Sequence, residues 1–268
     1  MIKRRNHGAG HSYYDVDADG NETKVPGVTT LLGDGIPKGG LTNWAAGEAA
    51  QYAITHWDEL QELGLLERAK QIQYAWQRTR DAAAGKGTTI HQLAEQLLHG
   101  QKVEIPPGLE GHVEACVRFL DTYQVEPVVS ETTVVNRAIP YAGTVDLVAD
   151  MLAGRLRAAR YLFDWKTGKS VYAEAALQLA AYAHAEHWVG GDGLEHPMSE
   201  LGIERAAVVH LRADGFDIYP MNIGEVTFNL FRHVALVGRW VKWDKETRSA
   251  RIDSLMGKAL QPDRAAAS

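Results

Sequence analysis

Cysteine is almost absent from this chain of 268 residues, in which Cys116 is the single example. One cysteine excludes an intrachain disulfide framework, a zinc site built on several cysteines, and an iron–sulfur cluster held by four cysteines of this chain. A long hydrophobic run is also lacking, and none follows the basic residues of the first seven positions. This is not the pattern of a signal peptide or a membrane span, so we expect a cytoplasmic protein with no membrane partner.

An excess of basic charge is lacking as well, since 28 lysines and arginines stand against 34 acidic residues and the net charge is −6. This balance excludes a protein that coats nucleic acid over its whole surface, because phosphate contacts on that scale need a basic surface. It is compatible with an enzyme that has a local basic groove beside an acidic site. The hydrophobic fraction of 45% and the charged fraction of 23% are those of an ordinary globular chain.

The pattern of apolar residues predicts one α/β domain over 1–268, in which a helical section precedes a sheet. Its parts are a lead-in at 1–40 with a hairpin around an acidic turn, a helical section at 41–125, a sheet core at 126–220 and a C-terminal helix within 221–260. Apolar positions three and four apart predict helices over 41–56, 65–84, 88–99, 109–123, 171–188 and 224–255. Runs rich in β-branched and aromatic residues predict strands over 128–135, 141–149, 161–166, 206–211 and 216–220.

The strand expected at 161–166 carries two charged residues in an otherwise apolar run. Side chains alternate along a strand, so Asp164 and Lys166 share one face while Phe163 and Trp165 share the other. An acid and an amine at the end of a core strand are costly to bury unless they have partners or a chemical role. We interpret this pair as holding a metal ion and a phosphate.

His91 is a candidate metal ligand near the start of the helix expected at 88–99. Thr89 and Gln92 fit a capping box, which puts His91 in the first turn. There the helix dipole opposes protonation and favours the neutral imidazole that binds metals. A lone histidine is more often an ordinary surface or core residue, so this assignment depends on support from other residues.

A hairpin expected between 128–135 and 141–149 contributes two more carboxylates. If it is centred between residues 138 and 139, Glu131 lies opposite Asp146, and the two repel each other unless a cation lies between them. If the register slips, Glu131 is simply solvated.

Three basic residues flank the central strand, and a polar pair follows it. Arg155, Arg157 and Arg160 could reach a phosphate, although a solvated loop is the more ordinary explanation for such residues. Gln178 and Tyr182 are four residues apart and share one face of the helix expected after the strand. Such a pair, taken alone, is more often structural than catalytic.

An acid and a lysine two residues apart are weak evidence alone, since Glu22-Thr23-Lys24 has the same spacing with nothing around it to support a site. The ordered set of elements is far more specific. In chain order it consists of Gly87 with His91, Gly143-Thr144-Val145-Asp146, Asp164-Trp165-Lys166, and Gln178 with Tyr182. This set resembles the PD-(D/E)XK nuclease superfamily, and in particular its RecB-like branch, which includes CRISPR-associated and phage exonucleases.

The resemblance implies a restriction-endonuclease-like core, in which helices flank a central mixed sheet and the section 41–125 is a helical insertion. It further implies that His91, Asp146, Asp164 and the Trp165 carbonyl hold one or two Mg²⁺ or Mn²⁺ ions, which such an oxygen-rich set suits. Glu131 would contact the metal or its water. Many relatives also hold an iron–sulfur cluster on four cysteines, and the single cysteine here places the chain with members that lack the cluster.

The resemblance also implies the remaining roles. Lys166 would orient or deprotonate the attacking water and offset charge on the scissile phosphate. Gln178 and Tyr182 would brace the site or hold the DNA backbone. Further DNA contacts would come from Arg155, Arg157 and Lys169.

The activity that follows is that of a metal-dependent exonuclease acting on DNA ends or single strands, in recombination, repair or phage replication. A single-strand-annealing or recombination protein would be a natural partner. A helical insertion arching over the site would favour exonuclease action. A structure-specific endonuclease of the same superfamily and a non-catalytic DNA-binding protein on this scaffold remain open alternatives. Cleavage polarity and oligomeric state also remain open.

Overall fold

The computed structural model describes residues 1–7, 10–152 and 159–247, with side chains described up to residue 241. The N-terminal sheet has three antiparallel strands, β1 (Ile2–His7), β2 (Gly10–Val16) and β3 (Glu22–Val25). Strands β2 and β3 form the expected hairpin, while β1 adds a strand that the sequence pattern did not predict. Within the described ranges, no helix combines the length and apolar character that a bilayer span requires.

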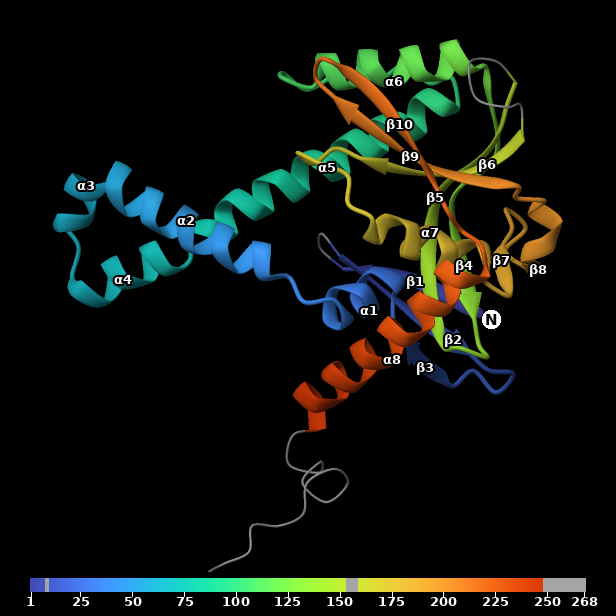
Figure 1. The fold of residues 1–268 in the computed structure, drawn as a ribbon, viewed down its shortest axis with the longest axis horizontal. Helices are drawn as coiled ribbons and strands as arrows, with labels where there is room; N and C mark the ends of the chain where they lie inside the picture. Colours follow the sequence, from blue (N-terminus) through green and yellow to red (C-terminus); the bar gives the residue numbers. More distant parts are fainter. Residues whose placement is uncertain (8–9, 153–158, 248–268) are drawn as a thin grey trace, which may run out of the picture.

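A mixed sheet of seven strands forms the centre of the molecule, in the order β10-β9-β6-β5-β4-β7-β8 (Figure 1). Its strands are β4 (Val125–Asn136), β5 (Tyr141–Met151), β6 (Ala159–Lys166), β7 (His187–Val189), β8 (Glu195–Pro197), β9 (Arg205–Arg212) and β10 (Gly215–Met221). Strands β6 and β9 run parallel, and the other neighbours are antiparallel. The predicted α/β class with a mixed sheet flanked by helices is therefore confirmed, and the five predicted strands are all present.

Helices cover both faces of this sheet. One face packs against α1 (Val28–Gly35), α7 (Glu174–Ala183) and α8 (Glu225–Thr247), and the other packs against α5 (Ala75–Leu98) and α6 (Glu110–Tyr123). Strand β6 contributes to both layers, because its side chains alternate. Phe163 and Trp165 contact the ring of Phe119 from α6, with ring centroids 5.5 and 5.6 Å away. Asp164 and Lys166 lie on the opposite face, as predicted.

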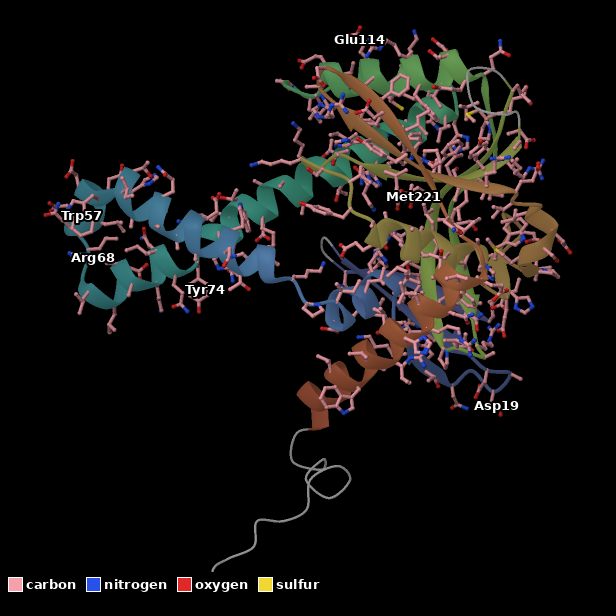
Figure 2. All side chains as sticks on the ribbon, in the orientation of Figure 1. Asp19, Trp57, Arg68, Tyr74, Glu114 and Met221 are labelled. Carbon is pink, nitrogen blue, oxygen red and sulfur yellow. The ribbon has the colours of Figure 1, made fainter. Side chains whose placement is uncertain are left out.

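The helical section contains α2 (Gly39–Thr55), α3 (Trp57–Gln61), α4 (Leu65–Gln73), α5 and α6. Helices α2 to α4 and the start of α5 extend away from the sheet as an arm, on which Trp57, Arg68 and Tyr74 lie (Figures 1 and 2). The prediction of separate helices over 65–84 and 88–99 is wrong, because the break lies at Tyr74 and α5 runs on through Gly85 and Gly87. Glycine weakens a helix without having to end it.

Two further helix predictions need correction. The helix expected over 171–188 ends at Ala183, and Trp188 instead belongs to β7, where it pairs with Val134 of β4. The apolar side chain of Trp188 fits a helical period, but backbone hydrogen bonds to β4 give this segment a strand conformation instead. The C-terminal helix begins as expected and is described as far as Thr247. The rest of its predicted range lies outside the described residues.

Candidate metal and hydrolytic site

A cleft of about 1090 Å³ opens where the ends of β5 and β6 meet α5, α7 and the N-terminal sheet. Residues far apart in the sequence line it, including Arg4, His91, Asp146, Lys166 and Tyr182. In the described part of the chain, the helical section contributes to its walls only through α5. The arm therefore does not arch over the site, and the expectation that it would do so is wrong.

Asp164 and Lys166 form the charged pair at the end of β6. The Lys166 Nζ lies 2.7 Å from Oδ2 of Asp164, whose side chain is 3% exposed, although their geometry is not that of a regular hydrogen bond. Burial by itself lowers the pKa of Lys166, but the carboxylates of Asp164 and Asp146 outweigh it and raise that pKa above its usual value. The ammonium is thus held in its charged form.

Asp146 lies beside this pair because β5 and β6 separate there. Their ladder of paired residues ends at Leu147 and Phe163. One step further, Oδ2 of Asp146 accepts a hydrogen bond from the Trp165 backbone N–H at 2.8 Å. Burial and the nearby charge of Asp164 raise the pKa of Asp146 well above its usual value. A half-buried carboxylate beside a buried one is unfavourable, and a cation would relieve that repulsion.

His91 reaches the site from the interior of α5. Its Nδ1 lies 3.7 Å from Oδ2 of Asp146. The predicted capping box is wrong, because the hydroxyl of Thr89 donates to the Gly85 carbonyl within the continuous helix. Burial, and not the helix dipole, lowers the pKa of His91, although the Asp164 charge and a hydrogen bond with the Trp165 backbone oppose the shift. The neutral imidazole expected of a ligand therefore has a different cause.

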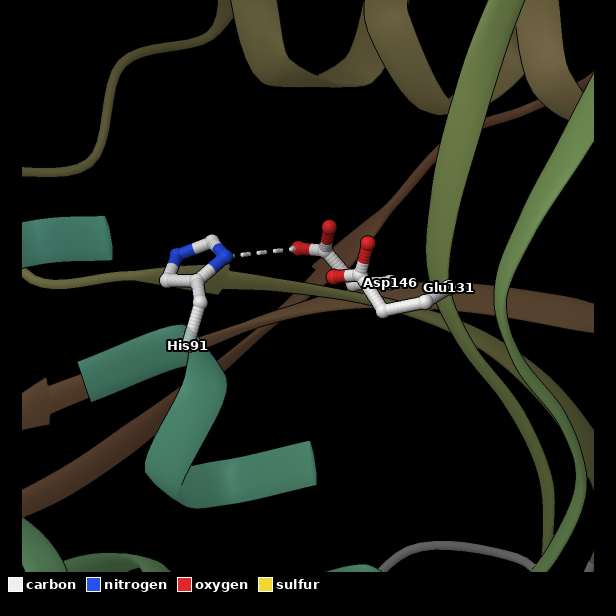
Figure 3. Close-up of side chains that lie close together, drawn as sticks. All are labelled: His91, Glu131 and Asp146. Carbon is white, nitrogen blue, oxygen red and sulfur yellow. Dashed lines mark ion pairs between the residues drawn. The ribbon is translucent and has the colours of Figure 1, made fainter. Parts of the chain in front are cut away.

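Glu131 completes a group of three possible ligands with His91 and Asp146. The hairpin has the predicted register, with Thr132 opposite Val145, so Glu131 faces Asp146. Glu131 also has a φ of 45°, a left-handed conformation that is uncommon outside glycine and often marks functional positions. One ligand atom from each of the three residues lies within 4.8 Å of the other two (Figure 3).

This donor set fits a hard divalent cation. Carboxylate oxygens suit Mg²⁺, and one imidazole among them suits Mn²⁺ as well. The three donor atoms all lie within 4.8 Å of one another, close enough for one ion to be shared among them.

Helix α7 braces the acid of the charged pair. The Gln178 amide nitrogen donates to Oδ1 of Asp164 at 2.8 Å and to the Tyr182 hydroxyl at 3.2 Å. The Gln178 amide oxygen accepts from Nζ of Lys166 at 3.3 Å. A glycine is needed at 143, since a Cβ there would lie 2.3 Å from the Tyr182 ring. Gln178 thus contacts the predicted acid and lysine directly, and Tyr182 contacts Gln178.

The predicted DNA contacts outside this cluster have a different outcome. Lys169 is exposed and does not line the cleft. Arg155 and Arg157 lie outside the described residues.

Several residues of the cleft had no signal in the sequence. Tyr13 is buried in the wall, and its hydroxyl lies 2.8 Å from Oγ1 of Thr144 and 2.9 Å from Nε2 of His11. Arg4 lines the same wall, with its guanidinium 3.3 Å from Oε2 of Glu131. These residues come from the N-terminal sheet, whose packing against the hairpin cannot be predicted from local periodicity. Neither family models nor curated proteins match this sequence.

Proposed function

We propose that the protein is a divalent-metal-dependent deoxyribonuclease that hydrolyses phosphodiester bonds. The exonuclease mode that we also propose is supported by the resemblance to the RecB-like branch and not by the arm. The observation that carries the proposal is the convergence of Asp146, Asp164, Lys166 and His91 from three elements on one cleft. Structural ion pairs seldom gather a buried acid, a half-buried acid, a lysine and an uncharged imidazole around open space. The ordered resemblance to PD-(D/E)XK nucleases supports the same reading.

The residues divide the chemistry between them. His91, Asp146 and Asp164, with Glu131 as a further ligand, would hold Mg²⁺ or Mn²⁺. A bound ion of this kind lowers the pKa of its water and neutralises charge on a phosphate. The pKa of Lys166 is raised, so its amine stays protonated and is a poor base. Its role is therefore to orient the nucleophilic water and to balance negative charge.

Digestion of end-labelled linear DNA with Mg²⁺, with Mn²⁺ or with a chelator tests the proposal. Wild-type protein should cleave with either ion and stop when it is removed. Lys166→Ala should slow cleavage by about 10³-fold or more while DNA binding largely persists, because its charge acts on the transition state. Cleavage at the wild-type rate in this variant would contradict the mechanism.

Lys24→Ala is the matched control, since Lys24 is an exposed lysine two residues after Glu22 on β3. It should cleave like the wild type. Covalently closed circular DNA separates the two modes of attack: an exonuclease leaves it intact, and an endonuclease opens it. Binding without cleavage under every metal condition would favour the non-catalytic alternative.

A further inference from the structure

Arg4 is a cation of the cleft that no catalytic role yet uses. It lies on β1, and its guanidinium reaches Oε2 of Glu131, 127 residues away in the sequence. The next residue, Arg5, belongs to the opposite face of the strand, where it pairs with Glu22 and lies 5.0 Å from the centre of the Tyr14 ring. The two arginines therefore share a strand but have different surroundings.

The charges that line the cleft present a problem for an anionic substrate. The described acidic residues there are Glu95, Glu131, Asp146 and Asp164, against the cations Arg4 and Lys166. Lys166 is already paired with Asp164. A phosphodiester entering this cleft therefore needs metal ions and a further cation for its backbone.

Glu131 has two competing uses. It is the partner of Arg4, and it is one of the three residues that could share a divalent ion with His91 and Asp146. A carboxylate that ligates a divalent ion has less charge to offer a guanidinium, and the ion itself repels the arginine. Metal binding would thus free Arg4 while leaving it at the wall of the cleft.

We infer that Arg4 exchanges partners, pairing with Glu131 in the ion-free protein and with a DNA backbone phosphate once a divalent ion occupies Glu131. This inference rests on the proposed function. An arginine suits the second partner because its planar guanidinium can donate two hydrogen bonds to one phosphate. The exchange couples the two ligands, so that metal strengthens DNA binding and DNA strengthens metal binding by the same factor.

The test measures the two ligands separately on Arg4→Ala and on Arg4→Gln, which keeps most of the side-chain length. Calorimetric titration with Mn²⁺ alone should show affinity about two- to fivefold higher than wild type, the range expected when a partly exposed ion pair stops competing. Binding of a short labelled DNA with Mn²⁺, measured in the Lys166→Ala background, should weaken about tenfold. The slope of the logarithm of DNA affinity against the logarithm of salt concentration should become shallower by about the amount of one phosphate contact.

Arg5→Ala is the control and should change neither measurement. Tighter Mn²⁺ binding together with weaker DNA binding supports the exchange, whereas a merely structural arginine would weaken both. Unchanged or weaker Mn²⁺ binding, or DNA binding equal to that of Arg5→Ala, overturns it. The Mn²⁺ titration needs no DNA, so failure of the wild type to cleave would count against the proposed function alone.

Discussion

Asp146 is a source of instability in the ion-free protein. Burial and the charge of Asp164 raise its pKa well above 3.8, so folding favours the protonated acid. Its contribution to stability is therefore complete at low pH and is lost as pH rises through the raised pKa. At neutral and alkaline pH the ionised carboxylate opposes folding unless a cation accompanies it.

We predict that Asp146→Asn raises the melting temperature of chelator-treated protein at pH 8 by about 2–4 °C, the shift that about 1 kcal/mol produces in a chain of this size. The gain should shrink as the pH is lowered towards 5. Added Mn²⁺ should stabilise the wild type, because an ion that binds the folded state and not the unfolded state raises stability. It should not stabilise the variant, which lacks the Asp146 carboxylate. Thermal unfolding at both pH values, with and without Mn²⁺, measures all three effects.

Asp150→Asn provides a control on the same strand. A hydrogen bond from Arg160 lowers the pKa of Asp150, so its contribution is present above pH 3.8 and lost at lower pH. This variant should lower the melting temperature at pH 8 and leave the Mn²⁺ effect intact. Melting curves of Asp146→Asn that match the wild type at every pH would show that the ionised Asp146 carboxylate does not destabilise the fold.

At the scale of residues, the sequence predicted those members of the site that carry their own local pattern. Asp164 and Lys166 could be placed on one face because strand alternation is strict, and Gln178 and Tyr182 because helical spacing is. His91 was predicted from the order of the motifs, and only its placement in a first helical turn was wrong. Arg4 could not be found, since its role depends on a partner more than a hundred residues away.

At the scale of elements, α5 shows how a helix tolerates two glycines. It continues from the arm into the cleft wall as one helix of 24 residues. Thr88 and Thr89 donate to the carbonyls of Ala84 and Gly85, which ties their side chains to the preceding turn. A Cβ at Gly85 would meet nothing within 4 Å, so the position has no steric need for glycine.

We therefore predict that Gly85→Ala stabilises the protein by about 0.5–1 kcal/mol, the difference between glycine and alanine inside a helix. Cleavage should remain at the wild-type rate, because Gly85 does not line the cleft and an added Cβ would contact nothing. Chemical denaturation gives the free energy of unfolding. By comparison, Gly111→Ala in α6 should destabilise, since its Cβ would lie 2.1 Å from the Ala213 carbonyl. A loss of stability in Gly85→Ala would mean that the helix is interrupted there.

Element types were easier to predict than element ends. The five long strands follow from runs of apolar and β-branched residues, and β6 and β9 are buried along most of their length. Strands β7 and β8 have three residues each, too few for a periodicity to be visible. The end of α7 was misjudged because Trp188 fits a helical spacing, and only the neighbouring strand reveals its other use.

At the scale of the whole molecule, Arg137 joins the two sheets. From the β4–β5 turn, its guanidinium donates to Asp15 of β2 and to Glu195 of β8, with distances of 2.8 Å. Its hydrogen bonds lower the pKa of Asp15 to about 2. The sheet that carries Arg4 and Tyr13 is thereby fixed against the sheet that carries the acids.

We predict that Arg137→Ala costs about 1–3 kcal/mol at pH 7, through lost charge-assisted hydrogen bonds and stranded carboxylates. The Asp15 contribution is present above pH 3.8 and lost as pH falls towards about 2, so the difference from wild type should narrow over that window. Urea unfolding at a series of pH values measures it. A deficit that stays constant down to pH 2 would show that the pairing with Asp15 is not its source.

The overall fold class could be predicted because a helical section followed by a series of strands and helices is compatible with few architectures. The placement of the N-terminal sheet and the direction of the arm could not, since both depend on contacts between distant segments. A restriction-endonuclease-like core remains a prediction, supported by the order of the motifs and by the cleft.

Consecutive residues of strand β6 point alternately into the aromatic core and into the cleft. This alternation limits where the chain can gain or lose residues. Inserting or deleting one residue just before Phe163 would exchange the two sides of the strand. The lysine would then lie among aromatic rings, and tryptophan would occupy the cleft. Gains and losses of sequence can therefore accumulate in the outlying arm, but within this strand even the smallest one would disrupt core and chemistry together.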